Sequence, residues 1–190
     1  MEAEWITTST ILTGLRDFED RGAWQRFVER FRAPVVRLAA QQGLALADAE
    51  DVAQETLLAF ADAFRAGRYD VEKGRLSRWL FGIAYRQIQR AREGRDRRAA
   101  ADLPEVPDDA AVTRSWDVEW ERAILEQCLA QARREVQPQT FRAFELTALE
   151  GRDAADAAAE LAVDVKAVYN AKHRLLQRVR ELRQAMEQVA

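Results

Sequence analysis

The stretch from Asp48 to Arg92, DAEDVAQETLLAFADAFRAGRYDVEKGRLSRWLFGIAYRQIQRAR, decides how the rest of the chain is interpreted. It begins as an acidic segment with helical spacing, passes through a connection that contains Gly67 and Gly74, and ends in an arginine-rich helical segment. Acidic and basic charge at opposite ends of one short unit indicates two partners of opposite charge. We expect the acidic helix to dock on a basic protein surface and the arginine-rich helix to meet nucleic acid.

The acidic start of this stretch has a structural explanation as well as a functional one. Asp48 is a plausible helix N-cap, with Asp51 as the acidic partner of a capping box. The helix dipole also favours negative charge in a first turn, which would account for Glu50. Helix initiation does not account for Gln54 and Glu55, which extend the polar face by another turn. Both explanations stay open at this point.

The second helix of the stretch combines aromatic and basic residues. Ser77 can cap it, and we expect Trp79 and Leu80 to belong to the core. Another aromatic residue near its start could instead stack on unpaired bases, because aromatic faces in a basic groove suit single strands. The arginines cannot all face the core, so a solvated or phosphate-facing surface follows. They occupy positions 86, 90 and 92.

The preceding residues, from about 15 to 42, have apolar side chains at helical spacing and predict one or two helices. Pro34 should interrupt or kink that run unless it opens a new helix. Gly43 is expected to end it.

The composition of residues 99–115 predicts a flexible acidic linker, because these residues combine small side chains, prolines and acids. Helical spacing returns from Trp116 to Val136. Pro138 fits the first turn of the next helix, and Gly151 fits a C-cap.

The last part of the chain predicts a short alanine-rich helix over 153–161, a tight turn, and a long basic helix from about 165 to 188 that Asp164 can cap. A short helix, a turn and a longer basic helix form a helix-turn-helix pattern, whose second helix enters the major groove. Side chains of these types read base edges or hold phosphates. The candidates are Lys166, Tyr169, Asn170, Lys172, His173, Arg174 and Arg178. A solvated, charged helix is the structural alternative.

The net charge of −3 conceals strong segregation. Residues 86–98 contain six arginines and two acids, and residues 102–126 contain eight acids and two bases. Residues 166–183 contain six Lys or Arg and one acid. Two basic segments therefore flank an acidic connector.

Several classes of protein are not expected. No apolar run is long enough for a membrane span, and the acidic N-terminus does not resemble a secretory signal. Cys128 is the single cysteine, which fits a reducing compartment and hence the cytoplasm. The lone His173 and the lack of phosphate-loop or HExxH motifs argue against a metal, a cofactor or an enzyme active site.

No strand-like alternation persists, so we predict an all-α protein with two small helical domains joined by the acidic linker, the C-terminal one a helix-turn-helix. The boundaries are 1–98, 99–115 and 116–190.

Three segments in this order resemble the bacterial sigma-70 family, in its small extracytoplasmic-function (ECF) type with regions 2 and 4. They are DAEDVAQETLLAF, GRLSRWLFGIA with its arginine tail, and FRAFELTALEGRDAADAAAELAVDVKAVYNAKHRLLQRVREL. The resemblance covers about residues 15–95 and 118–185. It implies a transcription initiation factor that binds core RNA polymerase, recognises promoters and helps to melt them.

The resemblance also implies sites. The acidic helix would dock on the β′ clamp of the polymerase through Asp48, Glu50, Asp51, Gln54 and Glu55. The 65–76 connection and the helix after it would bind the minus-10 element. The residues predicted there are Arg68, Tyr69, Lys73, Arg75, Arg78, Tyr85, Arg86 and Arg90.

The C-terminal domain, by the same resemblance, would read the minus-35 element and meet the β flap of the polymerase, and the acidic connector would lie in the active-site cleft. Control by an anti-sigma factor, a regulatory kinase or expression level stays open.

The chain departs from the family pattern at particular positions. Ala162 stands where a glycine is common, Ala171 where an arginine is frequent, Lys172 where a leucine is usual, and Arg86 where an asparagine is frequent. Promoter preference therefore does not transfer from relatives.

Two other functions remain as alternatives. A stand-alone helix-turn-helix regulator would bind duplex DNA tightly without polymerase. A sigma-like protein-interaction module would never contact DNA.

Overall fold

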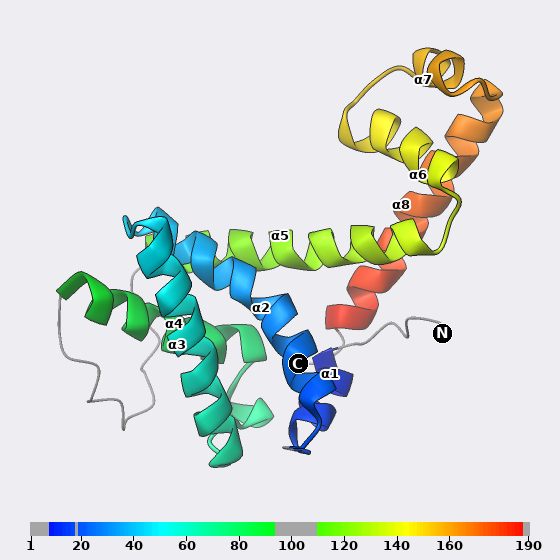
Figure 1. Cartoon of the computed structure of the whole chain (residues 1–190). Helices are drawn as coiled ribbons and strands as arrows, with labels where there is room; N and C mark the ends of the chain where they lie inside the picture. The colour runs from blue at the N-terminus through cyan, green and yellow to red at the C-terminus, as the bar shows by residue number, and fades with distance from the viewer. Residues whose placement is uncertain (1–7, 18, 94–109, 188–190) are drawn as a thin grey trace. The chain divides into compact units, whose positions relative to one another are not determined.

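The computed structural model of the chain describes residues 8–17, 19–93 and 110–187, and every regular element within them is a helix (Figure 1). This confirms the predicted all-α fold. The described residues form two compact units, and the chain passes from one to the other between Ala123 and Ile124. We call them the N-terminal unit and the C-terminal unit.

The N-terminal unit is built on α1 (Thr8–Leu15), α2 (Arg21–Gln41), α3 (Leu46–Arg65) and α4 (Leu76–Glu93), with the short 3-10 helix η1 (Val71–Lys73) before α4. Helix α2 packs along α3, and α3 packs along α4 (Figure 1). Asp20 caps α2, because its carboxylate accepts a hydrogen bond from the backbone N–H of Ala23 at 2.9 Å.

Helix α2 continues through Pro34, which lies buried inside it. The sequence predicted that Pro34 would interrupt or kink this run. The interruption is wrong, because α2 is one helix from Arg21 to Gln41. Gly43 follows the end of α2 with a φ of 88°, a conformation that glycine adopts without strain.

Aromatic rings fill the core of the N-terminal unit. Phe27 stacks on Phe60 with ring centroids 4.2 Å apart, and Phe60 meets Trp79 edge to face at 4.9 Å. Leu80 has no exposed surface. The assignment of Leu80 to the core is confirmed, and Trp79 packs against that core as a half-buried residue.

Two predicted N-caps are wrong. Helix α3 begins at Leu46 after Ala45, so Asp48 lies within the first turn, where it still complements the helix dipole. Helix α4 begins at Leu76, so Ser77 is already helical. In both places the packed helix extends beyond the side chain that could have capped it.

Helix α5 (Ala110–Arg134) begins six residues before the predicted start at Trp116. Trp116 is fully buried against Phe81, with ring centroids 5.7 Å apart. Trp120 stacks on Phe31 at 5.1 Å and 8°. This packing supports a helical start that the small and acidic residues alone did not suggest.

A polar contact fastens the same part of α5. Glu119 is only 4% exposed, accepts from Arg37 Nε, and accepts from Gln41 Nε2 at 2.6 Å. Both donors lie on α2.

The linker predicted over 99–115 is therefore wrong over 110–115, which are helical, and its 99–109 part lies outside the described residues. The boundary between the two compact units falls within the sequence of α5 rather than at this linker. The functional domains drawn at 1–98 and 116–190 stay predictions.

The C-terminal unit contains the rest of α5, then α6 (Pro138–Phe144), a π-helical turn η2 (Glu145–Leu149), α7 (Ala154–Leu161) and α8 (Val165–Glu187). Pro138 occupies the first turn of α6, as predicted, and Gly151 has the positive φ of 71° expected after a helix end. The π-helical turn was not predicted.

The connection from α7 to α8 is tight. Asp153 caps α7 by accepting from the Ala155 N–H at 2.7 Å, and Asp164 accepts from the Lys166 N–H at 2.6 Å. Between them Ala162 adopts φ 53° and ψ 44°, the left-handed conformation that disfavours a residue with a Cβ.

Among the described helices, none combines the length and the apolar character needed to cross a bilayer.

Candidate protein and nucleic-acid interfaces

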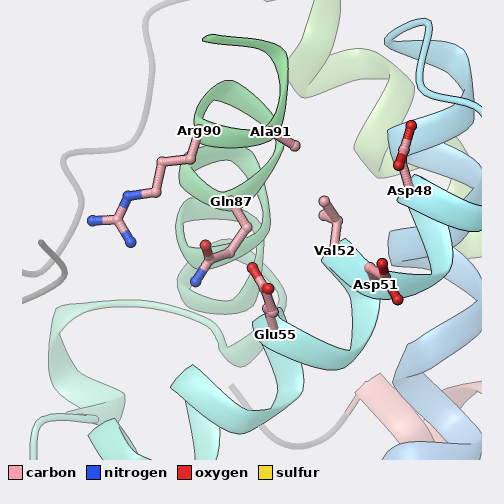
Figure 2. Close-up of a pocket in the computed structure, with 7 residues that line it drawn as sticks. All are labelled: Asp48, Asp51, Val52, Glu55, Gln87, Arg90 and Ala91. Carbon is pink, nitrogen blue, oxygen red and sulfur yellow. The ribbon is translucent and has the colours of Figure 1, made fainter. Parts of the chain in front are cut away.

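Three of the predicted polymerase-binding residues line a single pocket between α3 and α4 (Figure 2). Asp48, Asp51 and Glu55 recur at three- and four-residue spacing and so share one face of α3. Helix α4 supplies the opposite side of the pocket. The remaining lining residues are Val52, Gln87, Arg90 and Ala91.

The other two predicted residues lie elsewhere on α3. Glu50 forms an ion pair with Arg32 of α2, so its carboxylate already has a partner within the fold. Gln54 is exposed. Glu50 is turned by about 100° from Asp51, whereas Gln54 follows Asp51 by three residues and lies close to the same face. The predicted set is therefore divided into three residues that line the pocket and two that do not.

Leu58 extends the face of Asp51 and Glu55, and its side chain is 60% exposed. Sequence reasoning did not select it, because a leucine at helical spacing is usually assigned to the core. Its position three residues after Glu55 on an acidic face was the signal that could have identified it.

The connection between α3 and α4 presents Arg68, Lys73 and Arg75 to solvent. Lys73 forms an exposed ion pair with Asp70 at 3.6 Å. Tyr69 is less available, because its ring packs on Trp79 with centroids 5.0 Å apart and its hydroxyl donates to the Gly74 carbonyl at 3.5 Å. Burial, together with the charge of Asp70, raises the pKa of Tyr69.

Helix α4 divides its predicted DNA-binding residues as well. Arg78, Tyr85 and Arg86 are seven and eight positions apart, so they share a face. Arg78 lies over the Phe81 ring at 5.8 Å, a cation–π contact. Arg90 instead borders the acidic pocket of α3 (Figure 2). The predicted separation of an acidic protein site from a basic DNA site is thus incomplete.

Helix α8 presents a group of exposed polar residues near its start. Tyr169 is 60% exposed, and its neighbours on the same side are also exposed. They alternate with the buried residues Val168, Ala171 and Leu175, which pack α8 into the C-terminal unit. The exposed predicted residues are Lys166, Tyr169, Asn170, His173 and Arg174.

Lys172 and Arg178 differ from the rest of that set. Lys172 Nζ donates to the backbone carbonyl of Thr147 at 3.1 Å. Arg178 donates to both carboxylate oxygens of Glu135, at 2.6 and 2.9 Å. This bidentate contact is the main cause that lowers the pKa of Glu135 and raises the pKa of Arg178.

Comparison with protein families gives a match within the N-terminal unit. Residues 27–98 match the family model described as Sigma-70 region 2. The match spans α3 and α4, and with them every residue predicted to bind the polymerase or the minus-10 element. Comparisons with curated proteins and with solved structures gave no match.

Proposed function

We propose that this chain, a sigma-70 family sigma factor through its region 2 domain, is an ECF-type initiation factor that directs RNA polymerase to promoters with two helical domains. Region 2 implies a role in transcription initiation through binding of core RNA polymerase and the minus-10 element. A sigma factor is not an enzyme. The observation that carries the proposal is the match over 27–98 combined with the exposed acidic face of α3.

The polymerase site proposed here is narrower than the predicted one. It consists of Asp48, Asp51 and Glu55 around the pocket, with Leu58 beside them as an apolar contact. Exposed carboxylates steer a basic partner and fix its register, whereas a central apolar side chain adds buried area. The β′ clamp is the proposed partner.

The minus-10 site would combine the exposed cations of the α3–α4 connection with the face of α4 that carries Arg78 and Tyr85. Cations hold the backbone of a single strand, and aromatic rings stack on its bases. The partly exposed Tyr69 and Tyr85 supply such rings.

The minus-35 site would be the exposed face of α8, with α7, the Ala162 turn and α8 acting as a helix-turn-helix. Capping at Asp153 and Asp164 supports this assignment, because it fixes the start of each helix. Contact with the β flap, a cytoplasmic location and control by an anti-sigma factor or a kinase belong to the same proposal.

A charge reversal tests the polymerase site. We expect Asp51→Lys with Glu55→Lys to abolish co-purification with core RNA polymerase and promoter-directed run-off transcription, because two attractive contacts become repulsive. The circular dichroism spectrum should stay unchanged, since Asp51 is exposed and Glu55 lines an open pocket and does not belong to the core.

The matched control reverses two acids outside the pocket, Asp117 and Asp156, both exposed. This variant carries the same change in net charge and should bind polymerase normally. Unchanged core affinity in the Asp51 and Glu55 variant would refute the docking assignment. Leu58→Ser should weaken binding by a smaller factor without loss of stability.

The region 2 match separates the proposal from a stand-alone helix-turn-helix regulator, which has no use for a polymerase-docking domain. Promoter-specific transcripts from core polymerase plus the purified chain would support the sigma factor. Tight duplex binding without any effect on polymerase would favour the regulator.

A further inference from the structure

The cations of α8 fall into two groups that differ in what they contact. Lys166 and Arg174 are exposed. Lys172 and Arg178 are half-buried and bonded to other segments of the C-terminal unit. A donor that is already engaged must give up or share its partner before it can bind a phosphate. The two groups therefore suit different tasks.

Lys172 fastens α8 to the π-helical turn. In that turn Glu150 N–H donates to the Glu145 carbonyl at 2.9 Å, the wider i→i−5 pattern of a π-helix. The Lys172 ammonium group donates to the carbonyl of Thr147, a residue that is 5% exposed. A buried carbonyl without a donor is costly, so Lys172 stabilises the turn as well as the helix contact.

Arg178 fastens α8 at a second point, six residues further along. Its guanidinium group holds Glu135, the residue that follows α5, in a bidentate contact. Glu135 also accepts from Gln131 Nε2 at 2.9 Å, which fixes the carboxylate from the α5 side. A planar fork of this kind fixes orientation as well as distance.

We propose that Lys172 and Arg178 are positioning residues, which hold α8 against η2 and the end of α5 so that its exposed face meets DNA in one orientation. This role replaces the direct DNA contact that the sequence predicted for both of them. It rests on the proposed function, in which α8 binds promoter DNA.

The test uses the full chain bound to bacterial core RNA polymerase. The DNA probe is a duplex that this wild-type complex enriches from a randomised library, and the reference is an unselected duplex of equal length. Affinity for both is measured as a function of salt concentration.

A lysine that contacts a phosphate contributes about 0.9 to the slope of log affinity against log salt concentration. We expect Lys166→Met to reduce that slope by one such contact. Lys172→Met should leave the slope unchanged and reduce the preference for the enriched duplex severalfold. Lys172→Arg, which keeps a donor, should restore the preference and also serves as the test if Lys172→Met fails to fold.

Glu135→Gln distinguishes a positioning role of Arg178 from a direct DNA contact, because the two roles predict opposite changes in DNA binding. If Arg178 positions α8 through Glu135, the variant should lose preference for the enriched duplex, as Arg178→Met does. If Arg178 binds DNA directly, the variant should free its guanidinium group from Glu135, with the contact to Glu181 at 3.4 Å still present, and raise DNA affinity.

Two results would overturn the positioning role and leave the proposed DNA-binding function standing. One is a slope for Lys172→Met that falls as much as that for Lys166→Met, and the other is tighter DNA binding by Glu135→Gln. A library from which the wild-type complex enriches no duplex would instead refute the DNA-binding function, and the positioning role with it.

Discussion

The two units of the molecule are stabilised by different kinds of side chain. In the N-terminal unit, aromatic rings form a continuous cluster, in which Phe27 stacks on Phe60 and Trp120 stacks on Phe31. In the C-terminal unit, the core around α7 is mainly alanine with Leu146 and Val168. Small residues bring helices close together, whereas aromatic rings keep them apart and bury more surface per residue.

The charged contacts differ in the same way. The N-terminal unit buries Glu119 between α5 and α2. The C-terminal unit carries an exposed network around Arg142, which bonds Glu150 at 2.7 Å and lies 3.4 Å from Glu145, while Arg152 bonds Glu160 at 2.5 Å. Exposed pairs contribute little each, so the buried side chains of the C-terminal unit stabilise it more than this network does. This predicts different sensitivities in the two units.

The largest effect is expected at Trp116 in the N-terminal unit. Trp116→Ala should lower the free energy of unfolding by about 3–5 kcal/mol, because it removes a fully buried ring that contacts Phe81. Urea unfolding measures this. The control on the same helix is Val118→Ala, 64% exposed, which should change stability by less than about 0.5 kcal/mol. Equal effects of the two would mean that this part of α5 does not belong to the aromatic core.

A smaller loss is expected for the aliphatic core of the C-terminal unit. Leu146→Ala should cost about 3 kcal/mol, since Leu146 is fully buried in η2. Leu149→Ala in the same turn is the matched control, because that side chain is 53% exposed and should cost little. If Leu146→Ala lowered the unfolding midpoint of the N-terminal unit as much as that of the C-terminal unit, the two units would not unfold independently.

Backbone geometry gives an effect of the opposite sign. Ala162→Gly should stabilise the C-terminal unit by about 1 kcal/mol, because glycine adopts the left-handed conformation at φ 53° without strain. The same replacement at the exposed Ala159, inside α7, should destabilise it by about 1 kcal/mol. Thermal unfolding measures both variants. A loss of stability in Ala162→Gly as well as in Ala159→Gly would mean that the turn at Ala162 is not strained.

The smallest effect is a dependence on pH at Glu135. The guanidinium group of Arg178 lowers the pKa of Glu135 in the folded state below its ordinary value of 4.5. Wild type should therefore exceed Glu135→Gln in stability above that pKa and lose the advantage as pH falls through the folded value. Unfolding midpoints at about pH 7 and about pH 3 measure the difference. An advantage that grows in acid would contradict the ion pair.

Much of the fold could be predicted from short-range patterns. The apolar spacing located α3, α4 and α8, and the signals at Asp164 and Gly151 lie within one turn of the structure they control. The candidate site was only partly predictable. The acidic residues of α3 could be selected, yet the pairing of Glu50 with Arg32 of α2 and the pocket shared with Arg90 of α4 depend on how the helices pack.

The roles of Lys172 and Arg178 show the same limit. Both were predicted as DNA contacts, since each is a cation on a basic helix, and the positioning role proposed for them rests on other segments. Their partners, Thr147 and Glu135, lie 25 and 43 positions away, and no local pattern connects them.

The sequence by itself determined that the chain is helical, where its acidic and basic segments lie, and that residues 27–98 match the family model described as Sigma-70 region 2. Only the tertiary structure decided that α5 begins at Ala110 and joins the aromatic core, with Glu119 bonded to Arg37 across 82 positions. The physical reason is range. Helical spacing, caps and charge act over a few residues, whereas the burial of Trp116 and the pairing of charges depend on how whole helices pack.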